Sequence, residues 1–325
     1  MSSITIPART DTHPHLRPLS ILRDLPAVAD LIEICFSPTM DNEGRRYLQD
    51  MRRAGKDNSF LRWANRTVES TSLPLSGYIW EESGKIVGNA SLVPFKHHKE
   101  RIYLIANIAV HPDYRRRGIA RFLTERAKQH ALEKKVNNIW LHVRDDNPGA
   151  IELYSSLGFT EQARRTSWIA NTDSRLPTLP SDFSITRRNP NDWPTQLNWL
   201  SRLYPDPLAW HRNWNFNSLR PGLLNWLYLL LVDINIRQWA AVNSLGNLQA
   251  ALAWIPYGQG ESLFAATGEG SDPAALTLAL TQARRDLYHL YPTISLEFPS
   301  GQFDESIAAA GFKLQRTLIW MQATS

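Results

Sequence analysis

The chain has 325 residues, a formal net charge of +5 and a single cysteine, with 43% hydrophobic and 21% charged residues. This composition excludes a disordered chain and a fibrous repeat, and the length predicts about two domains. Because Cys35 is the only cysteine, an internal disulfide and thiolate sites for zinc or iron–sulfur clusters are excluded. The sequence has no apolar run of about 18 residues and no signal-peptide core, so we expect a cytoplasmic protein that does not enter a membrane.

The basic residues are concentrated in the first half of the chain. Residues 1–170 hold 25 Lys and Arg against 19 Asp and Glu, whereas the rest holds 11 against 12. This asymmetry predicts two modules with different roles, the first of which faces an anion. A nucleic acid, a phosphorylated cofactor and a solvated surface are all compatible with the charge alone.

The first module is predicted to alternate irregularly between helices and strands. Residues 1–13 are polar and predict a flexible tail, and a short strand near Leu16 leads to a helix for which Asp24 is a favoured N-cap residue. The segment from Glu82 to Lys85 predicts a hairpin turn. Periodicity predicts, in chain order, helices at 25–36 and 43–53, strands at 76–81, 86–93 and 102–110, a helix at 119–132, a strand at 138–143, a helix at 148–157 and a strand at 166–170. This order is typical of a mixed sheet rather than a regular βαβ repeat.

The second half is predicted to be a weak copy of the first. Residues 171–182 hold two prolines and little that can pack, so they predict a linker. Beyond it, Gly311-Phe312 repeats Gly158-Phe159, and each pair follows a predicted helix and precedes a last strand. We therefore expect a duplicated fold with domains at 14–170 and 183–325.

The most informative segment is 107–121, NIAVHPDYRRRGIAR, in which a strand runs through a loop of three arginines into a helix. Backbone N–H groups at a helix N-terminus are unpaired and carry the positive end of the helix dipole, so they bind phosphate. Gly118 allows close approach of the backbone, and Ala120 keeps the same surface free of bulk. The segment is neither a Walker A loop nor a Rossmann fingerprint, because it lacks the glycine patterns of both.

Arg115-x-x-Gly118-x-Ala120, after the strand at 105–110, resembles the acyl-CoA signature of the GNAT superfamily of N-acetyltransferases. The resemblance continues through residues 140–159, WLHVRDDNPGAIELYSSLGF, and these segments are most similar to ribosomal-protein alanine N-acetyltransferases. It implies the GNAT fold over 14–170, which is a mixed, mostly antiparallel α/β (α+β) sheet flanked by helices. It also implies acetyl-CoA as cosubstrate and no metal.

The resemblance assigns roles to particular residues. Main-chain groups of Ile108, Ala109 and Val110 would bind the pantetheine arm in an opening between two splayed strands, and Asn147 would contact the cofactor arm. Tyr154 stands where the family commonly has a tyrosine near the thioester sulfur, and it belongs to the cofactor set as well. The pyrophosphate would lie on Arg115, Arg116, Arg117, Gly118, Ile119 and Ala120.

The chemistry of acetyl transfer requires an acid and a base. An alkyl amine with a pKa near ~10 has to lose a proton before it attacks a thioester, and a hydroxyl can protonate the departing thiolate. We predict Tyr154 as the general acid and His142 as the general base, because imidazole titrates near neutral pH. In the ribosomal-protein enzymes a glutamate occupies the place of His142, so a base elsewhere, or a proton relayed by a water that Asn107 positions, stays open.

The second module lacks an equivalent phosphate loop. Residues 268–272 there are acidic or polar, and Ile307 stands at the position of Tyr154. We expect a degenerate domain that has lost acyl-CoA binding and either shapes the acceptor pocket or stabilises the first domain.

The function predicted on these grounds is transfer of an acetyl group from acetyl-CoA to a primary amine, either a peptide N-terminus or a small molecule. The alternative is a non-catalytic acyl-CoA sensor or interaction module. Nucleic acid is not favoured, because the arginines cluster at a phosphate-sized loop and not along a stripe. The identity of the acceptor, the length of the acyl group and the oligomeric state stay open.

Overall fold

The computed structural model describes residues 13–40, 42–54, 76–176, 182–186, 188–211, 216–222, 236–257 and 260–323. Residues 1–12 of the predicted tail and 177–181 of the predicted linker lie outside this part of the chain. Two compact units are formed: Met1–His142 with Glu152–Thr160 and Gln322–Ser325, and Val143–Ile151 with Glu161–Met321. No helix among the described residues has both the length and the apolar character that a membrane span needs.

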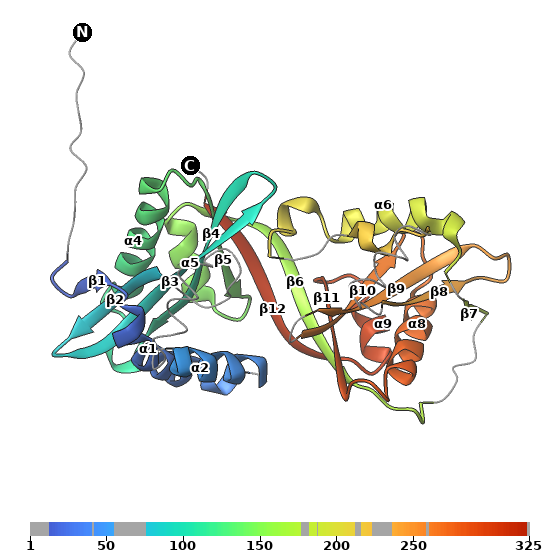
Figure 1. Cartoon of the computed structure of the whole chain (residues 1–325), viewed down its shortest axis with the longest axis horizontal. Coiled ribbons are helices and arrows are strands. Elements are labelled where there is room, and N and C mark those ends of the chain that lie inside the picture. The colour runs from blue at the N-terminus through green and yellow to red at the C-terminus, as the bar shows by residue number, and fades with distance from the viewer. Residues whose placement is uncertain are drawn as a thin grey trace, which may run out of the picture. The chain divides into compact units, whose positions relative to one another are not determined.

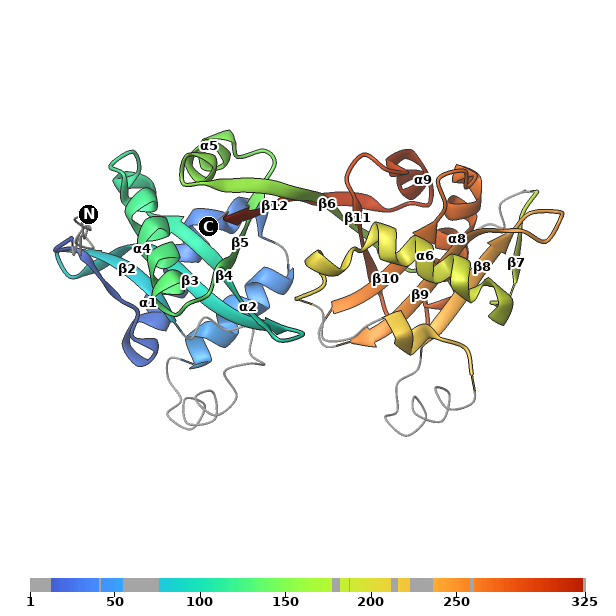
Figure 2. The same ribbon diagram turned by 90° about the horizontal axis from the view of Figure 1, so that it is seen from above.

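The first unit is a sheet in the order β1–β2–β3–β4–β5. Helix α4 covers one face of β2, β3 and β4, and helices α1 and α2 lie on the other (Figures 1 and 2). The division between the units falls within β5 and α5. The elements are β1 (Leu16–Pro18), α1 (Ile21–Phe36), α2 (Asn42–Ala54), β2 (Ser76–Glu82), β3 (Lys85–His97), β4 (Glu100–Val110), α4 (Ile119–Glu133), β5 (Asn138–Arg144) and α5 (Pro148–Ser156).

The predicted hairpin turn is confirmed and the predicted cap of the first helix is wrong. Ser83 and Gly84 both have positive φ, of 50° and 74°, which is the conformation that a two-residue hairpin loop requires. Helix α1 begins at Ile21, and its N-cap is Ser20. Asp24 lies inside the helix, is buried, and accepts hydrogen bonds from Ser20 N (2.7 Å) and Arg17 Nη1 (2.6 Å). Burial alone raises the pKa of Asp24, but these hydrogen bonds leave it below its usual value.

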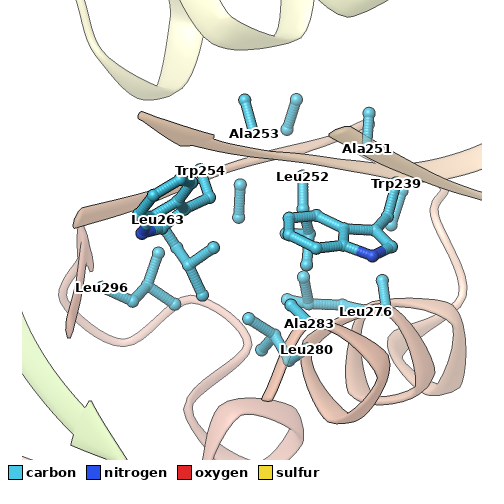
Figure 3. Close-up of a cluster of buried hydrophobic side chains, with 14 of the residues drawn as sticks. Trp239, Ala251, Leu252, Ala253, Trp254, Leu263, Leu276, Leu280, Ala283 and Leu296 are labelled. Carbon is cyan, nitrogen blue, oxygen red and sulfur yellow. The ribbon is translucent and has the colours of Figure 1, made fainter. Parts of the chain in front are cut away.

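The second unit holds the sheet order β12–β6–β11–β10–β9–β8–β7, with α6 on one face and α8 and α9 on the other (Figure 1). Figure 3 shows its core, where Leu252 and Trp254 of β9 point toward α8 and Ala251 and Ala253 point to the opposite face, as the two-residue period of a strand requires. The elements are β6 (Phe159–Asn171), β7 (Ser184–Thr186), α6 (Trp193–Leu203), β8 (Arg237–Val242), β9 (Leu248–Tyr257), β10 (Gly260–Thr267), α8 (Pro273–Asp286), β11 (Thr293–Pro299), α9 (Asp304–Ala309) and β12 (Lys313–Ala323).

The two halves of the chain repeat one order of elements, as the paired Gly-Phe motifs predict. The series β2–β3–β4–α4–β5–α5–β6 returns as β8–β9–β10–α8–β11–α9–β12. Gly158 and Gly311, which end α5 and α9, both have a φ of 82°. The carbonyl before each glycine accepts a hydrogen bond from a cation on the preceding long helix, Lys128 Nζ at 2.9 Å and Arg284 Nη1 at 2.6 Å. The predicted fold class, a mixed and mostly antiparallel sheet in tandem, is confirmed.

Strand β6 ends the first repeat in the sequence, yet from Glu161 onward it belongs to the second unit. It lies between β12 and β11, and Thr166 stands opposite Phe298 in its antiparallel register with β11. The second unit therefore includes a central strand that precedes the predicted linker.

Candidate functional site

Strands β4 and β5 lie side by side for part of their length and then stop pairing. Their parallel ladder joins residues 102–105 to 138–141 and ends there, although β4 continues to Val110. Backbone groups on the edge of a strand that has lost its partner need other hydrogen-bond partners, which a ligand can supply. The predicted pantetheine-binding residues Ile108, Ala109 and Val110 lie on this last part of β4.

A bulge in β4 separates its paired part from the predicted cofactor-binding part. The register with β3 pairs Ser91 with Ala106 but Asn89 with Ala109, so residues 107 and 108 stand opposite one residue of β3. Asn107 has a φ of 52°, in the left-handed region that Asn tolerates better than most residues. A bulge of this kind re-aims the backbone groups that follow it.

Side chains from two other elements hold this bulge. Asn89 Nδ2 donates to Asn107 O at 2.8 Å, and Asn107 Nδ2 donates to Tyr47 Oη at 2.8 Å. Burial raises the pKa of Tyr47 to about 12, and the hydrogen bond from Asn107 opposes that shift. The tyrosine is therefore a neutral hydroxyl at physiological pH. Tyr47 was not predicted as a site residue, because its partner lies 60 residues away and the sequence of its helix is that of an ordinary basic helix.

The loop after β4 leads into α4 through two residues in left-handed conformation. Arg116 has a φ of 64°, and Gly118, the N-cap of α4, has a φ of 78°. The first helical hydrogen bond here runs from Phe122 N to Gly118 O at 3.1 Å. The N–H groups of Ile119 and Ala120 precede it and so have no partner within the helix. The N-terminus of α4, where Gly118 is exposed and Ile119 is buried, thus carries the positive end of the helix dipole that the phosphate prediction requires.

The three arginines of this loop are exposed and differ in their contacts. Arg115 Nε donates to Val110 O at 3.1 Å, so this side chain is folded back on β4. Arg117 stacks over the Tyr114 ring at 4.8 Å and donates to Asp113 O at 3.2 Å. Arg117 also forms an ion pair with Glu82 at 3.7 Å. Among the described residues the Arg116 side chain makes no hydrogen bond or ion pair, so its charge is the most available of the three to an anion.

Cys35 ties the end of α1 to the same place. Its Sγ donates to Val110 O at 3.3 Å, beside Arg115. Burial raises the pKa of this thiol although Arg115 opposes the shift, so the thiol is protonated and unreactive at neutral pH. Sequence analysis used Cys35 only to exclude disulfides and did not place it at the site.

The predicted acid and base lie on neighbouring elements. Tyr154, on α5, is 6% exposed, and its ring packs edge-on against Phe159 at 6.4 Å. Burial raises the pKa of Tyr154 well above its usual value, so the hydroxyl keeps its proton at any physiological pH. His142 is half-buried and directly follows Leu141, the last residue of β5 that pairs with β4. The catalytic roles of both residues stay predictions.

Asn147 caps α5 and is exposed. Its Oδ1 accepts from Ala150 N at 3.2 Å, and its carbonyl accepts from Ile151 N at 3.1 Å. If Asn147 contacts the cofactor arm as predicted, it would do so through its amide Nδ2, because its side-chain oxygen already accepts a hydrogen bond from the helix backbone. This role too stays a prediction.

Comparison with known proteins agrees with the predicted resemblance. Residues 32–159 match the model of the acetyltransferase (GNAT) family. Over 69 residues the chain is 45% identical to the ribosomal protein bS18-alanine N-acetyltransferase of Escherichia coli strain K12, covering 21% of this chain and 47% of that protein. It is also 33% identical over 61 residues to the mycothiol acetyltransferase of Tsukamurella paurometabola, covering 19% and 21%. The chain thus spans about half the length, or less, of these curated relatives.

One solved structure is similar over both units. The GCN5-related N-acetyltransferase of Sphaerobacter thermophilus superposes with a TM-score of 0.57, covering 95% of this chain and 96% of its own, at 14% sequence identity. At that identity the likeness concerns the fold alone.

Proposed function

We propose that this protein, whose residues 32–159 match the model of the acetyltransferase (GNAT) family, transfers an acetyl group from acetyl-CoA directly to a primary amine. The observation that carries the proposal is the continuous path from the bulge in β4, along the last part of β4 that no longer pairs with β5, to the N-terminus of α4. We expect it to act in the cytoplasm.

The residues of this path fit acetyl-CoA. A side-chain carbon added at Gly118 would meet only the Phe122 ring, at 3.7 Å, so the surface beside the α4 N-terminus is open to a ligand. Arg116 and the N–H groups of Ile119 and Ala120 would hold the pyrophosphate. The main chain from Ile108 to Val110 would hold the pantetheine arm. When bound, acetyl-CoA supplies the reactive thioester.

The chain's own groups would supply the proton transfers. His142 would take a proton from the attacking amine, because imidazole is the side chain whose charge change ordinarily falls near neutral pH. Tyr154 would donate a hydrogen bond to the sulfur as negative charge develops there. Its raised pKa keeps the hydroxyl protonated, so that it can donate this hydrogen bond.

For the acceptor we propose a peptide N-terminus or a small primary amine. The support is the Escherichia coli relative, which is named for N-acetylation of an alanine of ribosomal protein bS18. The matched 69 residues cover 47% of that relative, so its acceptor is not carried over to this chain.

Thermal unfolding with acetyl-CoA tests cofactor binding. A ligand at about 100 times its Kd adds ~2.7 kcal/mol to folding stability, so the wild type is expected to melt at a higher temperature. Gly118→Glu places a carboxylate at the phosphate site and is expected to lose this shift. Gly118→Ala carries the same backbone strain without the charge and serves as its control. A shift in Gly118→Glu equal to that of the wild type would contradict the proposal.

A non-catalytic acyl-CoA sensor is the second candidate, and the deep burial of Tyr154 is the observation that favours testing it. Thiol release from acetyl-CoA is measured with a panel of primary amines. For an enzyme, Tyr154→Phe is expected to lower turnover about 100-fold with little change in acetyl-CoA affinity. Ser155→Ala, an exposed neighbour on α5, is the control. Wild-type protein that binds acetyl-CoA but releases no thiol with any amine would establish the sensor instead.

A further inference from the structure

The second unit repeats the end of pairing that forms the candidate site in the first. The parallel ladder of β10 and β11 joins residues 262–263 to 295–296 and ends there, as the ladder of β4 and β5 ends at 105 and 141. By this register, Ala265 corresponds to the bulge in β4, and Glu297 corresponds to His142. Strand β10 itself runs against β9 in unbroken register from Gly260 to Thr267, so it keeps a straight ladder where β4 is bulged.

A tyrosine bridges the two strands where their pairing ends. Tyr204, at the end of α6, is 6% exposed. Its Oη accepts from Ala265 N at 3.2 Å and donates to Glu297 O at 3.1 Å. One hydroxyl therefore satisfies a backbone donor of β10 and a backbone acceptor of β11 that no longer pair with each other.

An arginine from β6 covers this tyrosine. Arg165 is 4% exposed, and its guanidinium lies over the Tyr204 ring at 4.8 Å. Its Nε donates to Glu297 Oε1 at 3.1 Å, and its Nη1 donates to Leu203 O at 2.6 Å. The charge of Arg165 is thus compensated within the unit, as a buried guanidinium requires. We call Tyr204 and Arg165 together the plug.

The end of β10 is occupied as well. Arg202 Nη2 donates to Thr267 O at 2.8 Å, and Arg202 forms an ion pair with Glu269 at 2.8 Å. The indole of Trp199 lies so close to Gly268 that an added side-chain carbon would sit 2.9 Å from it. The C-terminal half of α6 thus engages backbone of β10 at the positions that, in β4, precede the phosphate loop.

We propose that the plug closes the second unit's counterpart of the acyl-CoA opening, so that Tyr204 stands where a pantetheine arm would lie and each chain binds one acyl-CoA. The inference rests on the proposed function for the location of the first site. Besides lacking a phosphate loop, the second unit would thus have the space itself filled by the plug. The Tyr204 hydroxyl also satisfies the backbone of β10 and β11 there.

Isothermal titration of the intact protein with acetyl-CoA measures the number of sites. One molecule per chain is expected for the wild type, and no saturable binding is expected for Gly118→Glu. Two sites in the wild type, one of which survives in Gly118→Glu, would overturn the inference, whereas a single site that survives in Gly118→Glu would contradict the proposed location of the first site. Absence of binding in the wild type would instead overturn the proposed function, and the next experiment then decides the role of Tyr204 by itself.

Amide hydrogen exchange followed by mass spectrometry tests the bridge directly. Tyr204→Phe keeps the ring beneath Arg165 but removes both hydrogen bonds of the hydroxyl. Exchange of the peptide that contains Ala265 is expected to become about tenfold faster, the effect of losing one buried hydrogen bond. Tyr288→Phe, at a tyrosine of the same unit that is 43% exposed, is the control and should leave that peptide unchanged. Unaltered protection at Ala265 in Tyr204→Phe would show that the hydroxyl does not close the opening.

Discussion

At the scale of single residues, Asn107 shows what a sequence pattern can and cannot indicate. Its place on a strand just before the arginine loop marks it as a residue of the site. Its partners, however, are 18 and 60 residues away in sequence, on β3 and α2. Local periodicity holds no information about such contacts, so the left-handed backbone and the bulge at Asn107 were not predicted. That Tyr154 lies on a helix was predictable, because the residues next to it in the sequence are enough to indicate the helix.

We predict that Tyr47→Phe lowers kcat clearly while it lowers the free energy of unfolding only modestly. The change removes the hydroxyl that accepts from Asn107 and leaves the ring, so about 0.5–1.5 kcal/mol of unfolding free energy is lost. Because the bulge aims the backbone that we propose to hold the acyl-CoA arm, kcat is expected to fall about tenfold through misplacement. Urea unfolding and steady-state kinetics measure the two effects. Tyr103→Phe, on β4 with Asn107, is the control. A loss of stability with unchanged kcat would limit Tyr47 to a structural role.

The His130 imidazole predicts a dependence of stability on pH. His130 Nδ1 is 2.9 Å from Tyr78 Oη, and burial, followed by Lys134 and Arg126, lowers its pKa below the usual value. A lowered pKa means that the folded state prefers neutral His130. The contribution of His130 to the free energy of unfolding is therefore complete above pH ~6.5, the unfolded pKa, and is lost as the pH falls below that value. Urea midpoints at pH 7.5 and pH 5 are expected to differ more for the wild type than for His130→Gln. Equal differences in the two proteins would show that His130 does not titrate on unfolding.

At the scale of elements, short-range patterns predicted nearly every helix and strand of the first module. The helix predicted at 119–132 spans Ile119–Glu133, and the strand predicted at 102–110 spans Glu100–Val110. The largest difference is β6, predicted at 166–170 and observed from Phe159 to Asn171. Residues 160–165 are mostly polar and were not included in the predicted strand, since their strand conformation depends on pairing with distant strands. Element boundaries were thus predictable where side-chain periodicity decides them and not where tertiary pairing does.

The packing of α4 on β3 predicts a coupled loss of stability and cofactor affinity. A side-chain carbon added at Gly88 would lie 2.9 Å from both Ile119 Cγ2 and Leu123 Cδ1. Gly88→Ala is therefore expected to cost about 1–3 kcal/mol of unfolding free energy. Because Ile119 is the first residue of α4, the same displacement should weaken acetyl-CoA binding. Gly270→Ala, where no atom lies within 4 Å of the added carbon, is the control. Wild-type stability and affinity in Gly88→Ala would mean that the two elements adjust without moving the helix.

At the scale of the whole molecule, the duplication was predictable and the assignment of β6 was not. The paired Gly-Phe motifs share a φ of 82° and a cation bound to the preceding carbonyl, so a local structural need preserves them in both halves. The predicted boundary at 171–182 rests on the composition of that segment. Composition indicates that a segment has few side chains that can pack, but it does not indicate which sheet the neighbouring strands join. Strand β6, which precedes the segment, lies between β12 and β11. The domain limits at 170 and 183 therefore stay a prediction beside the two units that the contacts define.

This difference leads to a prediction about fragments. A fragment of residues 183–325 lacks β6, so β11 and β12 lose the strand between them, and the core loses Trp168 and Ala170, each only 4% exposed. Exposed strand edges and a missing core strand are expected to make this fragment aggregate or stay unfolded. A fragment of residues 143–325 keeps β6, Arg165 and the complete plug, and we expect it to fold cooperatively. Size-exclusion chromatography and thermal melting by circular dichroism distinguish the two. A cooperative melt of the shorter fragment at the midpoint of the longer one would show that β6 is dispensable to the second unit and that the predicted linker is its true boundary.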